Sequence, residues 1–242
     1  MNRTISELYE RKSVRAFADR EIPESAINEI ITAACMAPTA GNQQLYTIIK
    51  ITDPEIKKRL SESCDNQPFI AEGKLLLVFC ADCLKWYEAF KFAGCEPRLP
   101  GPGDLLLAVD DALIAAQNAV TAAWSEGIGS CYIGDIMENC EQQREILQLP
   151  EYVFPAALVV FGYPVEQQKN RAKPERCSLD YILRENAYRR LDSAELKSML
   201  LKNCSEETYE SWIKAFCRRK YNSDFSREMN RSVAKYLEQF EI

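Results

Sequence analysis

Three cations and a hydroxyl lie within five positions near the start of the chain, at Arg11, Lys12, Ser13 and Arg15. A phosphate is held by charge-assisted hydrogen bonds from groups that converge on it. Arginine offers a bidentate fork, and serine adds a directional donor. The cluster is therefore a candidate phosphate clamp. The alternative interpretation is a solvated helix end, where cations interact favourably with the helix dipole.

A second basic run lies far along the chain and consists of Lys169, Arg171, Lys173 and Arg176. One such run alone is typical of an exposed loop. Two basic segments from distant parts of one chain can also meet on a single phosphate. The presence of both segments is a stronger indication of a phosphate site than either segment alone.

Two further motifs resemble known sites only in part. The glycine-rich segment 127–134 lacks the third glycine of a dinucleotide fingerprint and enters a predicted strand instead of opening a helix, which argues against a Rossmann site. Its glycines still allow the backbone to approach a flat ring. Cys80 and Cys83 have the spacing of redox dithiols and zinc sites, but the sequence contains no second CxxC pair. Buried thiols at a strand end are the favoured interpretation.

The sequence of 242 residues contains no histidine. This excludes Ser-His-Asp and Cys-His nucleophile systems, HExxH zinc sites and histidine acid-base chemistry. Chemistry must depend on other side chains or on a bound cofactor. A redox cofactor fits best, because it carries the reactive centre and requires only binding, orientation and electrostatics from the protein.

The net charge is −6, with 36 acidic and 30 basic residues, so we expect no general nucleic-acid surface. The first residues have no apolar signal region, and the longest apolar runs are too short to cross a bilayer. We therefore expect a cytoplasmic protein that does not bind a membrane. Ten cysteines spread through apparent core segments are expected to be reduced thiols.

The expected elements are helices around a central sheet in three layers. Thr4 and Glu7 form a predicted capping box for the first helix, and Asp82 is the predicted cap of a helix that follows a strand. The segment 96–103, rich in proline and glycine, is predicted to be a surface loop. The predicted strands cover residues 46–51, 75–80 and 156–161, with a short one inside 127–134. The predicted helices cover residues 4–11, 23–37, 53–64, 104–126, 138–147, 194–201, 205–220 and 225–240.

Four segments together resemble the FMN-dependent nitroreductase family in type, order and spacing. They are RKSVRAF at 11–17, APTAGNQQ at 37–44, DNQPF at 65–69 and the long segment 108–134. The resemblance extends over roughly residues 4–190. It implies an α+β fold with a central mixed, mostly antiparallel sheet flanked by helices. It also implies an FMN-binding domain at 1–190, a helical extension at 191–242, and a homodimer with FMN at the subunit interface.

Carried over position by position, the resemblance implies the following cofactor contacts. The FMN phosphate and ribityl chain would be held by Arg11, Lys12, Ser13 and Arg15, and completed by Lys173 and Arg176. The flavin and its ribityl chain would also contact Thr39, Asn42, Gln67, Tyr132, Ile133 and Gly134. Three positions depart from the family pattern: Glu72-Gly73-Lys74 replaces a small residue and proline, Asp135 replaces a common glycine, and Glu175 interrupts the Lys-Pro-Arg element.

The implied reaction is a ping-pong hydride transfer through flavin N5, from NAD(P)H to a small electron-poor acceptor such as a nitroaromatic, a quinone or a free flavin. It requires no protein acid or base. Other hypotheses are a different reductive enzyme on the same scaffold, such as a dehalogenase, and an FMN-binding redox sensor or carrier without turnover. A cysteine-based metal protein is the last alternative.

Overall fold

The computed structural model describes residues 1–240, which form two compact units. The first unit contains residues 1–171 together with the C-terminal segment from residue 228, and the second contains residues 172–227. The compact units therefore divide at residue 172, before the boundary at 191 expected for the domains. The chain after Glu228 returns to the first unit. The domains 1–190 and 191–242 stay a prediction.

The first unit is built on a sheet whose described strands have the order β1-β2-β4-β3. These strands are β1 (Tyr46–Ile51), β2 (Leu75–Asp82), β3 (Gly129–Ile133) and β4 (Val153–Gly162). Each ladder between them is antiparallel, and a parallel pairing is found at the isolated bridge between Ser13 and Ser130. The α+β fold with a mostly antiparallel sheet is confirmed.

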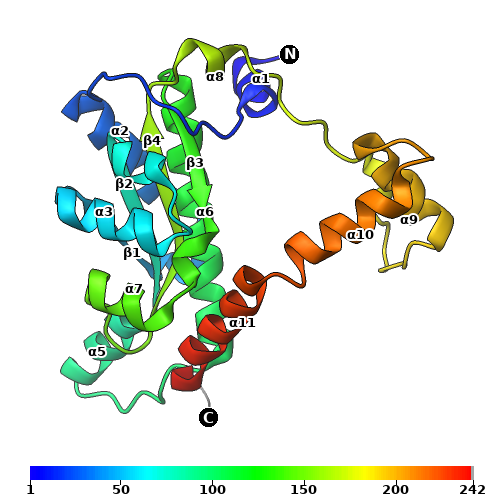
Figure 1. Ribbon diagram of the computed structural model, residues 1–242. Helices are drawn as coiled ribbons and strands as arrows, with labels where there is room; N and C mark the ends of the chain where they lie inside the picture. Colours follow the sequence, from blue (N-terminus) through cyan, green and yellow to red (C-terminus); the bar gives the residue numbers. More distant parts are fainter. Residues whose placement is uncertain (241–242) are drawn as a thin grey trace. The chain divides into compact units, whose positions relative to one another are not determined.

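Alternating side chains of the buried strand β2 point into two different cores, as the twofold periodicity of a strand requires. Leu75, Leu77 and Phe79 pack with helices α2 (Glu24–Cys35) and α6 (Pro102–Ser125). Leu76 and Val78 pack on the opposite face with residues of α3 (Pro54–Ser63), α4 (Pro68–Glu72) and α7 (Cys140–Leu147). Figure 1 shows the resulting three layers, which agree with the sequence-based expectation.

Of the remaining helices, α1 (Arg3–Glu10), α9 (Ser193–Leu200), α10 (Tyr209–Lys220) and α11 (Asp224–Leu237) lie close to the predicted bounds. Helix α5 (Leu84–Phe92) follows the predicted cap Asp82, and the short α8 (Glu166–Asn170) was not predicted. Three caps need correction. The first helix is capped by Asn2 instead of Thr4, and α6 begins after Gly101, with Asp104 in its first turn. The Asp82 carboxylate accepts from the N–H groups of Leu84 and Lys85, each at 3.1 Å, although Cys83 is the N-cap residue.

Helix α6 is long and apolar enough to cross a membrane by length and composition. Its buried face nevertheless belongs to the core of the first unit, where small alanine side chains let it approach α2 and the sheet closely. The helix predicted at 104–126 is therefore confirmed, and one of its faces is buried. The opposite face exposes Leu106, Leu107, Leu113 and Ile114.

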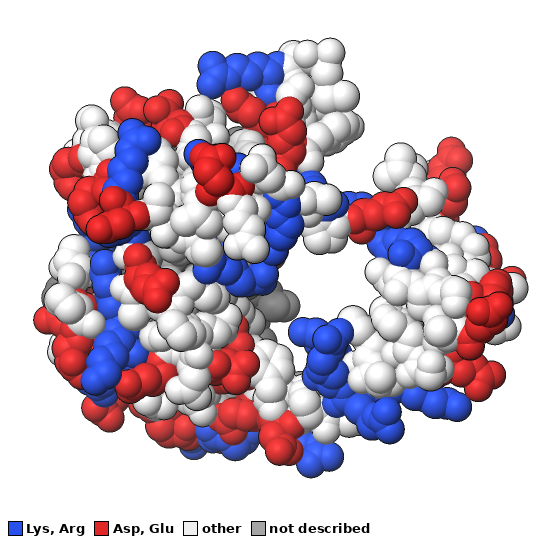
Figure 2. All heavy atoms as spheres, turned by 45° about the horizontal axis from the view of Figure 1, so that its top comes forward, with Lys and Arg blue, Asp and Glu red and all other residues white. Residues whose placement is uncertain are grey.

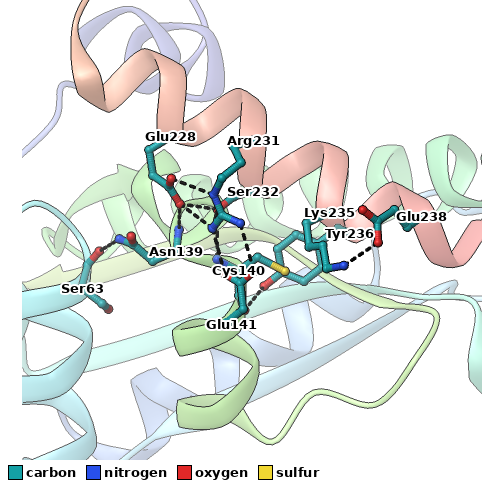
Figure 3. A network of polar contacts seen from close by, with 10 residues as sticks. All are labelled: Ser63, Asn139, Cys140, Glu141, Glu228, Arg231, Ser232, Lys235, Tyr236 and Glu238. Carbon is teal, nitrogen blue, oxygen red and sulfur yellow. Dashed lines mark hydrogen bonds and ion pairs between the residues drawn. The ribbon is translucent and has the colours of Figure 1, made fainter.

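Residues of α11 cap the start of α7 in place of a local side chain (Figure 3). The Glu228 carboxylate accepts from the Asn139 N–H at 3.2 Å, and the Ser232 hydroxyl accepts from the Cys140 N–H at 3.0 Å. A helix N-terminus leaves N–H groups without intrahelical partners, and an acidic side chain there also interacts well with the helix dipole. This polar contact fixes α11 against the first unit.

Apolar contacts and an ion pair strengthen the attachment of α11 to the first unit. Tyr236 and Phe240 are almost completely buried, and the Tyr236 ring meets Phe154 edge-on with a centroid distance of 5.0 Å. Arg231 forms two hydrogen bonds to the Glu141 carboxylate at 2.9 and 2.8 Å. The C-terminal segment is therefore part of the first unit's core.

Glu138 is a buried carboxyl group at the same junction. It is 5% exposed, and its Oε1 atom accepts no hydrogen bond within residues 1–240. Burial, followed by repulsion from Asp135, Asp65 and Glu228, raises the pKa of Glu138 to about 7. Because the folded protein binds this proton more tightly than the unfolded chain does, protonation of Glu138 favours folding. This stabilisation is fully present below the unfolded pKa and is lost as pH rises through about 7.

We expect Tyr236→Ala to lower the free energy of unfolding by about 3 kcal/mol or more, because it leaves a large cavity under α11. The control is Leu237→Ala, since the neighbouring Leu237 is 39% exposed. Urea denaturation would measure both. Equal small losses would contradict the assignment of Tyr236 to the core.

At pH 8 we expect Glu138→Gln to melt about 3 °C above the unaltered protein, because the neutral amide replaces a buried charge. A shift of this size corresponds to about 1 kcal/mol at this chain length. The difference should shrink at pH 5, where Glu138 is protonated in the folded protein. Melting curves at both values, with the exposed Glu151→Gln as control, measure this effect. A difference independent of pH would show that Glu138 does not titrate near neutrality.

Candidate functional site

The basic segment after α1 lies against the start of β3. The Val14 N–H donates to the Ser130 carbonyl at 2.9 Å, and Val14 is buried. A Cβ at Gly129 would come within 2.6 Å of the Val14 side chain, so glycine permits this close approach. Arg11 is the C-cap residue of α1, and Lys12 and Ser13 continue from it into an extended segment at the edge of the sheet, where all three residues are partly buried.

The first part of the second basic run lies beside this segment, while the predicted meeting of the two segments on one phosphate stays a prediction. Lys12 Nζ donates to the carbonyls of Lys169 at 2.6 Å and Arg171 at 2.5 Å. The Arg171 guanidinium in turn donates to the Ser13 carbonyl at 2.5 Å. The ammonium of Lys12 therefore ties the two basic segments together through backbone carbonyls.

The other part of that run belongs to the second compact unit. Lys173 and Arg176 lie beyond the division at residue 172, and their expected part in the phosphate site stays a prediction. Glu175, which interrupts the Lys-Pro-Arg element, accepts at its backbone carbonyl from Lys202 Nζ at 3.2 Å within the same unit.

Arg11 provides the clearest sign that the basic segment binds an anion. Its Nη1 atom is buried and has no hydrogen-bond partner within residues 1–240. A buried charged donor without an acceptor is costly, and native proteins rarely leave one unpaired. A phosphate oxygen would be a suitable acceptor. Burial raises the pKa of Tyr132 to about 12, and the positive charge on Arg11 opposes this rise. The Arg11 charge is therefore close enough to affect Tyr132, near the end of β3.

Cys131 lies inside the same cationic cluster. Burial raises the pKa of its thiol, while the charge and hydrogen bond of Arg15, the Ser13 hydroxyl and the charge of Arg11 oppose that rise. The side chains of Ser13 and Arg15 therefore converge on β3 beside Arg11. On the face drawn in Figure 2, Lys and Arg side chains alternate with Asp and Glu over the first unit, so an anion there would require a local cluster of cations such as this one.

The strand end predicted to lie along a flat ring is partly uncovered. Tyr132 and Ile133 end β3, and Gly134 begins a single turn of 3-10 helix. Gly134 is exposed, and a Cβ placed on it would have no neighbour within 4 Å. The backbone here is open to a planar ligand, although no contact within the chain requires glycine. The contacts of these three residues with a ring stay a prediction.

The predicted contacts Thr39 and Asn42 lie in a loop between α2 and β1. Gly41 and Asn42 both have φ of +56°, the left-handed region. Thr39 donates its hydroxyl hydrogen to Asp111 of α6, and its oxygen accepts from the Gln44 N–H at 2.7 Å. Asp111 is a residue of this site that our sequence analysis did not identify. A carboxylate on the apolar side of a helix, where charge requires partners, is the signal that points to it.

Gln67 is held at the start of α4. Its side-chain amide donates to the Cys64 carbonyl at 2.8 Å, and its own carbonyl accepts from the Ser61 hydroxyl at 2.8 Å. The departure at residues 72–74 also has a structural explanation. Lys74 Nζ donates to Asp19 and Glu21, each at 2.8 Å, and these two ion pairs direct the lysine ammonium toward the segment before α2.

The two cysteines with CxxC spacing lie at the end of β2. Cys80 and Cys83 are both buried free thiols, and burial raises the pKa of each to about 12. Buried thiols were the favoured interpretation. Within residues 1–240, no group of three or more cysteine, aspartate or glutamate side chains is arranged to hold a metal ion.

Comparisons with known proteins agree with this geometry. A model of the nitroreductase family matches residues 8–163. An FMN reductase (NAD(P)H) of Bacillus subtilis is 30% identical, with 98% of this chain and 92% of the relative covered. An FMN reductase (NADPH) of the same strain is 28% identical, with 99% and 93% covered. The solved structure of NfrA1 from B. megaterium superimposes with a TM-score of 0.85 at 26% identity, with 97% and 98% covered.

The family model spans more than half of the chain, and both reductases align along nearly all of it. The basic segment at residues 11–15, the loop at 39–45 and the strand β3 all lie inside the matched region. The chain belongs to the nitroreductase family.

Proposed function

We propose that this protein is an FMN-dependent oxidoreductase that uses NAD(P)H to reduce small electron-poor acceptors such as nitroaromatics, quinones or free flavins. The observation that carries the proposal is the buried, unpartnered guanidinium nitrogen of Arg11 beside Ser13 and Arg15. The two reductases that align along the chain support the cofactor and the electron donor.

The residues of the first unit fit the cofactor. Arg11, Ser13 and Arg15 would hold the phosphate, while Lys12 keeps the 169–171 segment beside them. Tyr132, Ile133 and Gly134 would lie along the ring. Thr39, Asn42 and Gln67 would add contacts from other elements, and Lys173 with Arg176 would complete the phosphate site. When bound, FMN supplies the centre that accepts and donates hydride.

The loop at 96–103 lines a candidate acceptor pocket of about 300 Å³. Trp86, Tyr87 and Phe90 of α5 form its aromatic wall, and Gln43 connects it to the loop that carries Thr39 and Asn42. Such a pocket suits a planar aromatic ring, because aromatic side chains bury large apolar area and stack well. Arg98 is held at its edge by two hydrogen bonds to Asp104, at 2.5 and 3.0 Å.

The same proposal includes a homodimer. The exposed leucine and isoleucine side chains of α6 form one apolar face, which is expected at a subunit interface. The second compact unit supports a partner as well, because none of residues 172–227 is buried in the single chain. Helices without a buried face require another surface to pack on. The helical extension would pack on the partner or on the main domain.

A cytoplasmic location is also part of the proposal. All ten cysteines are free thiols, although several are partly or fully exposed. Free thiols persist in a reducing compartment, whereas oxidising compartments favour disulfides.

We expect Arg11→Gln to weaken FMN binding by about tenfold or more, because a charge-assisted hydrogen bond to the phosphate is lost. Titration of the apoprotein with FMN, followed by flavin fluorescence, would measure the Kd. Arg3→Gln is the control, since Arg3 is an exposed residue of α1 paired with Glu7. Unchanged affinity in the folded Arg11→Gln protein would contradict the phosphate assignment.

We expect Leu113→Glu to shift the protein from dimer to monomer, because a carboxylate in the apolar face of α6 would be desolvated on association. Sedimentation velocity would measure the mass. Phe92→Glu, at the exposed end of α5, is the control and should remain dimeric. An unaltered protein that is monomeric, or a Leu113→Glu protein that is dimeric, would argue against α6 as the interface.

A further inference from the structure

The loop from Thr39 to Leu45 has a backbone that its sequence does not favour locally. Besides Gly41, the non-glycine residues Asn42 and Gln44 have φ of +56° and +52°. For an L-residue this left-handed conformation costs about 1 kcal/mol, although asparagine tolerates it better than most. The loop conformation must therefore be imposed by the elements packed against it.

Asp111 imposes it from α6. Its carboxylate is 4% exposed and accepts from the N–H groups of Ala40 and Leu45, each at 3.1 Å, and from the Thr39 hydroxyl. The two N–H donors lie at opposite ends of the loop. A single buried side chain thus fixes both ends, and its charge is balanced by converging hydrogen bonds.

Helix α5 holds the middle of the same loop. The Trp86 indole N–H donates to the Gln43 carbonyl at 2.8 Å. Lys85 Nζ donates to the carbonyls of Gln44 at 2.9 Å and Tyr46 at 3.0 Å. The loop is therefore held from two helices, through its N–H groups by α6 and through its carbonyls by α5.

The Thr39 hydroxyl has a defined direction as a result. Its hydrogen is donated to Asp111, and one lone pair accepts from the Gln44 N–H. Only one lone pair remains for a ligand. In this arrangement the hydroxyl can accept from a ligand O–H or N–H but cannot donate to a ligand carbonyl.

We propose that Asp111 is a positioning residue for the cofactor. It fixes the loop from Thr39 to Leu45 and orients the Thr39 hydroxyl as an acceptor toward a donor group of the bound flavin. The inference rests on the proposed function, because it requires FMN beside Thr39 and Asn42. It extends that function by naming a residue that does not touch the flavin and still determines how tightly the loop holds it.

The test compares Asp111→Asn with Asp110→Asn. Asp110 is the adjacent, exposed residue of the same helix, so the control has the same change of charge and shape. The asparagine amide must turn its NH₂ toward one of the loop donors, which leaves that donor unpaired and displaces the loop. We expect the FMN Kd of Asp111→Asn to rise about tenfold, the effect of about 1.4 kcal/mol, and that of Asp110→Asn to stay unchanged.

A second measurement separates positioning from a general loss of stability. At saturating FMN, the visible absorbance spectrum of the flavin bound to Asp111→Asn should differ from that of the unaltered protein. A purely structural role would lower the melting temperature and leave this spectrum unchanged. Asp111→Asn protein that is folded, with an unchanged Kd and an unchanged spectrum, would overturn the inference.

Trp86→Phe keeps the inference testable if Asp111→Asn does not fold. It retains an aromatic ring and removes the hydrogen bond to the Gln43 carbonyl, so we expect a smaller increase of the FMN Kd, about threefold. An unchanged Kd would then overturn the inference. If the unaltered protein does not bind FMN, the proposed function itself fails, whereas normal binding by the unaltered protein together with an unchanged Kd of the folded variant rejects the role of Asp111 alone.

Discussion

The hydrogen bond between the Val14 N–H and the Ser130 carbonyl is the contact on which the candidate site depends. β3 is the last described strand of the sheet, and an uncovered strand edge presents unpaired backbone groups. The segment around Val14 covers part of this edge, and it approaches closely because Gly129 has no side chain. The same contact holds Arg11 with its unpartnered guanidinium nitrogen next to Tyr132. One contact therefore covers the strand edge and also positions the residues of the candidate anion site.

Helix α6 connects the other parts of the structure. One face is buried against the sheet and α2, the neighbouring Asp111 carboxylate reaches the loop before β1, and the exposed face is apolar. In the proposed dimer, this helix links the core, the loop that carries Thr39 and Asn42, and the subunit contact. The C-terminal segment adds a second link, because α11 supplies the cap of α7 and buries Tyr236 beside Phe154.

Local signals in the sequence predicted much of this fold. Asp53 caps α3, with Pro54 at the first helical position, and the apolar runs form the central strands β2 and β4. The basic side chains also indicated that the two basic segments could lie together, although Lys12 contacts the second segment through its backbone carbonyls. The capping of α7 by Glu228 and Ser232 was not, since those residues are about 90 positions away and only tertiary packing brings them together. Asp111 was passed over because periodicity presents it as one more residue of an apolar helix.

The proposed chemistry of this chain is the binding of FMN and the exchange of reducing equivalents through it. An anaerobic absorbance spectrum of the purified protein, recorded before and after addition of NADPH and separately NADH, tests it most directly. We expect a bound flavin spectrum that bleaches with at least one of the two donors and returns when a quinone or nitroaromatic is added. A flavin that stays oxidised with both donors would contradict the reductase function, and a protein that binds no FMN would contradict the site.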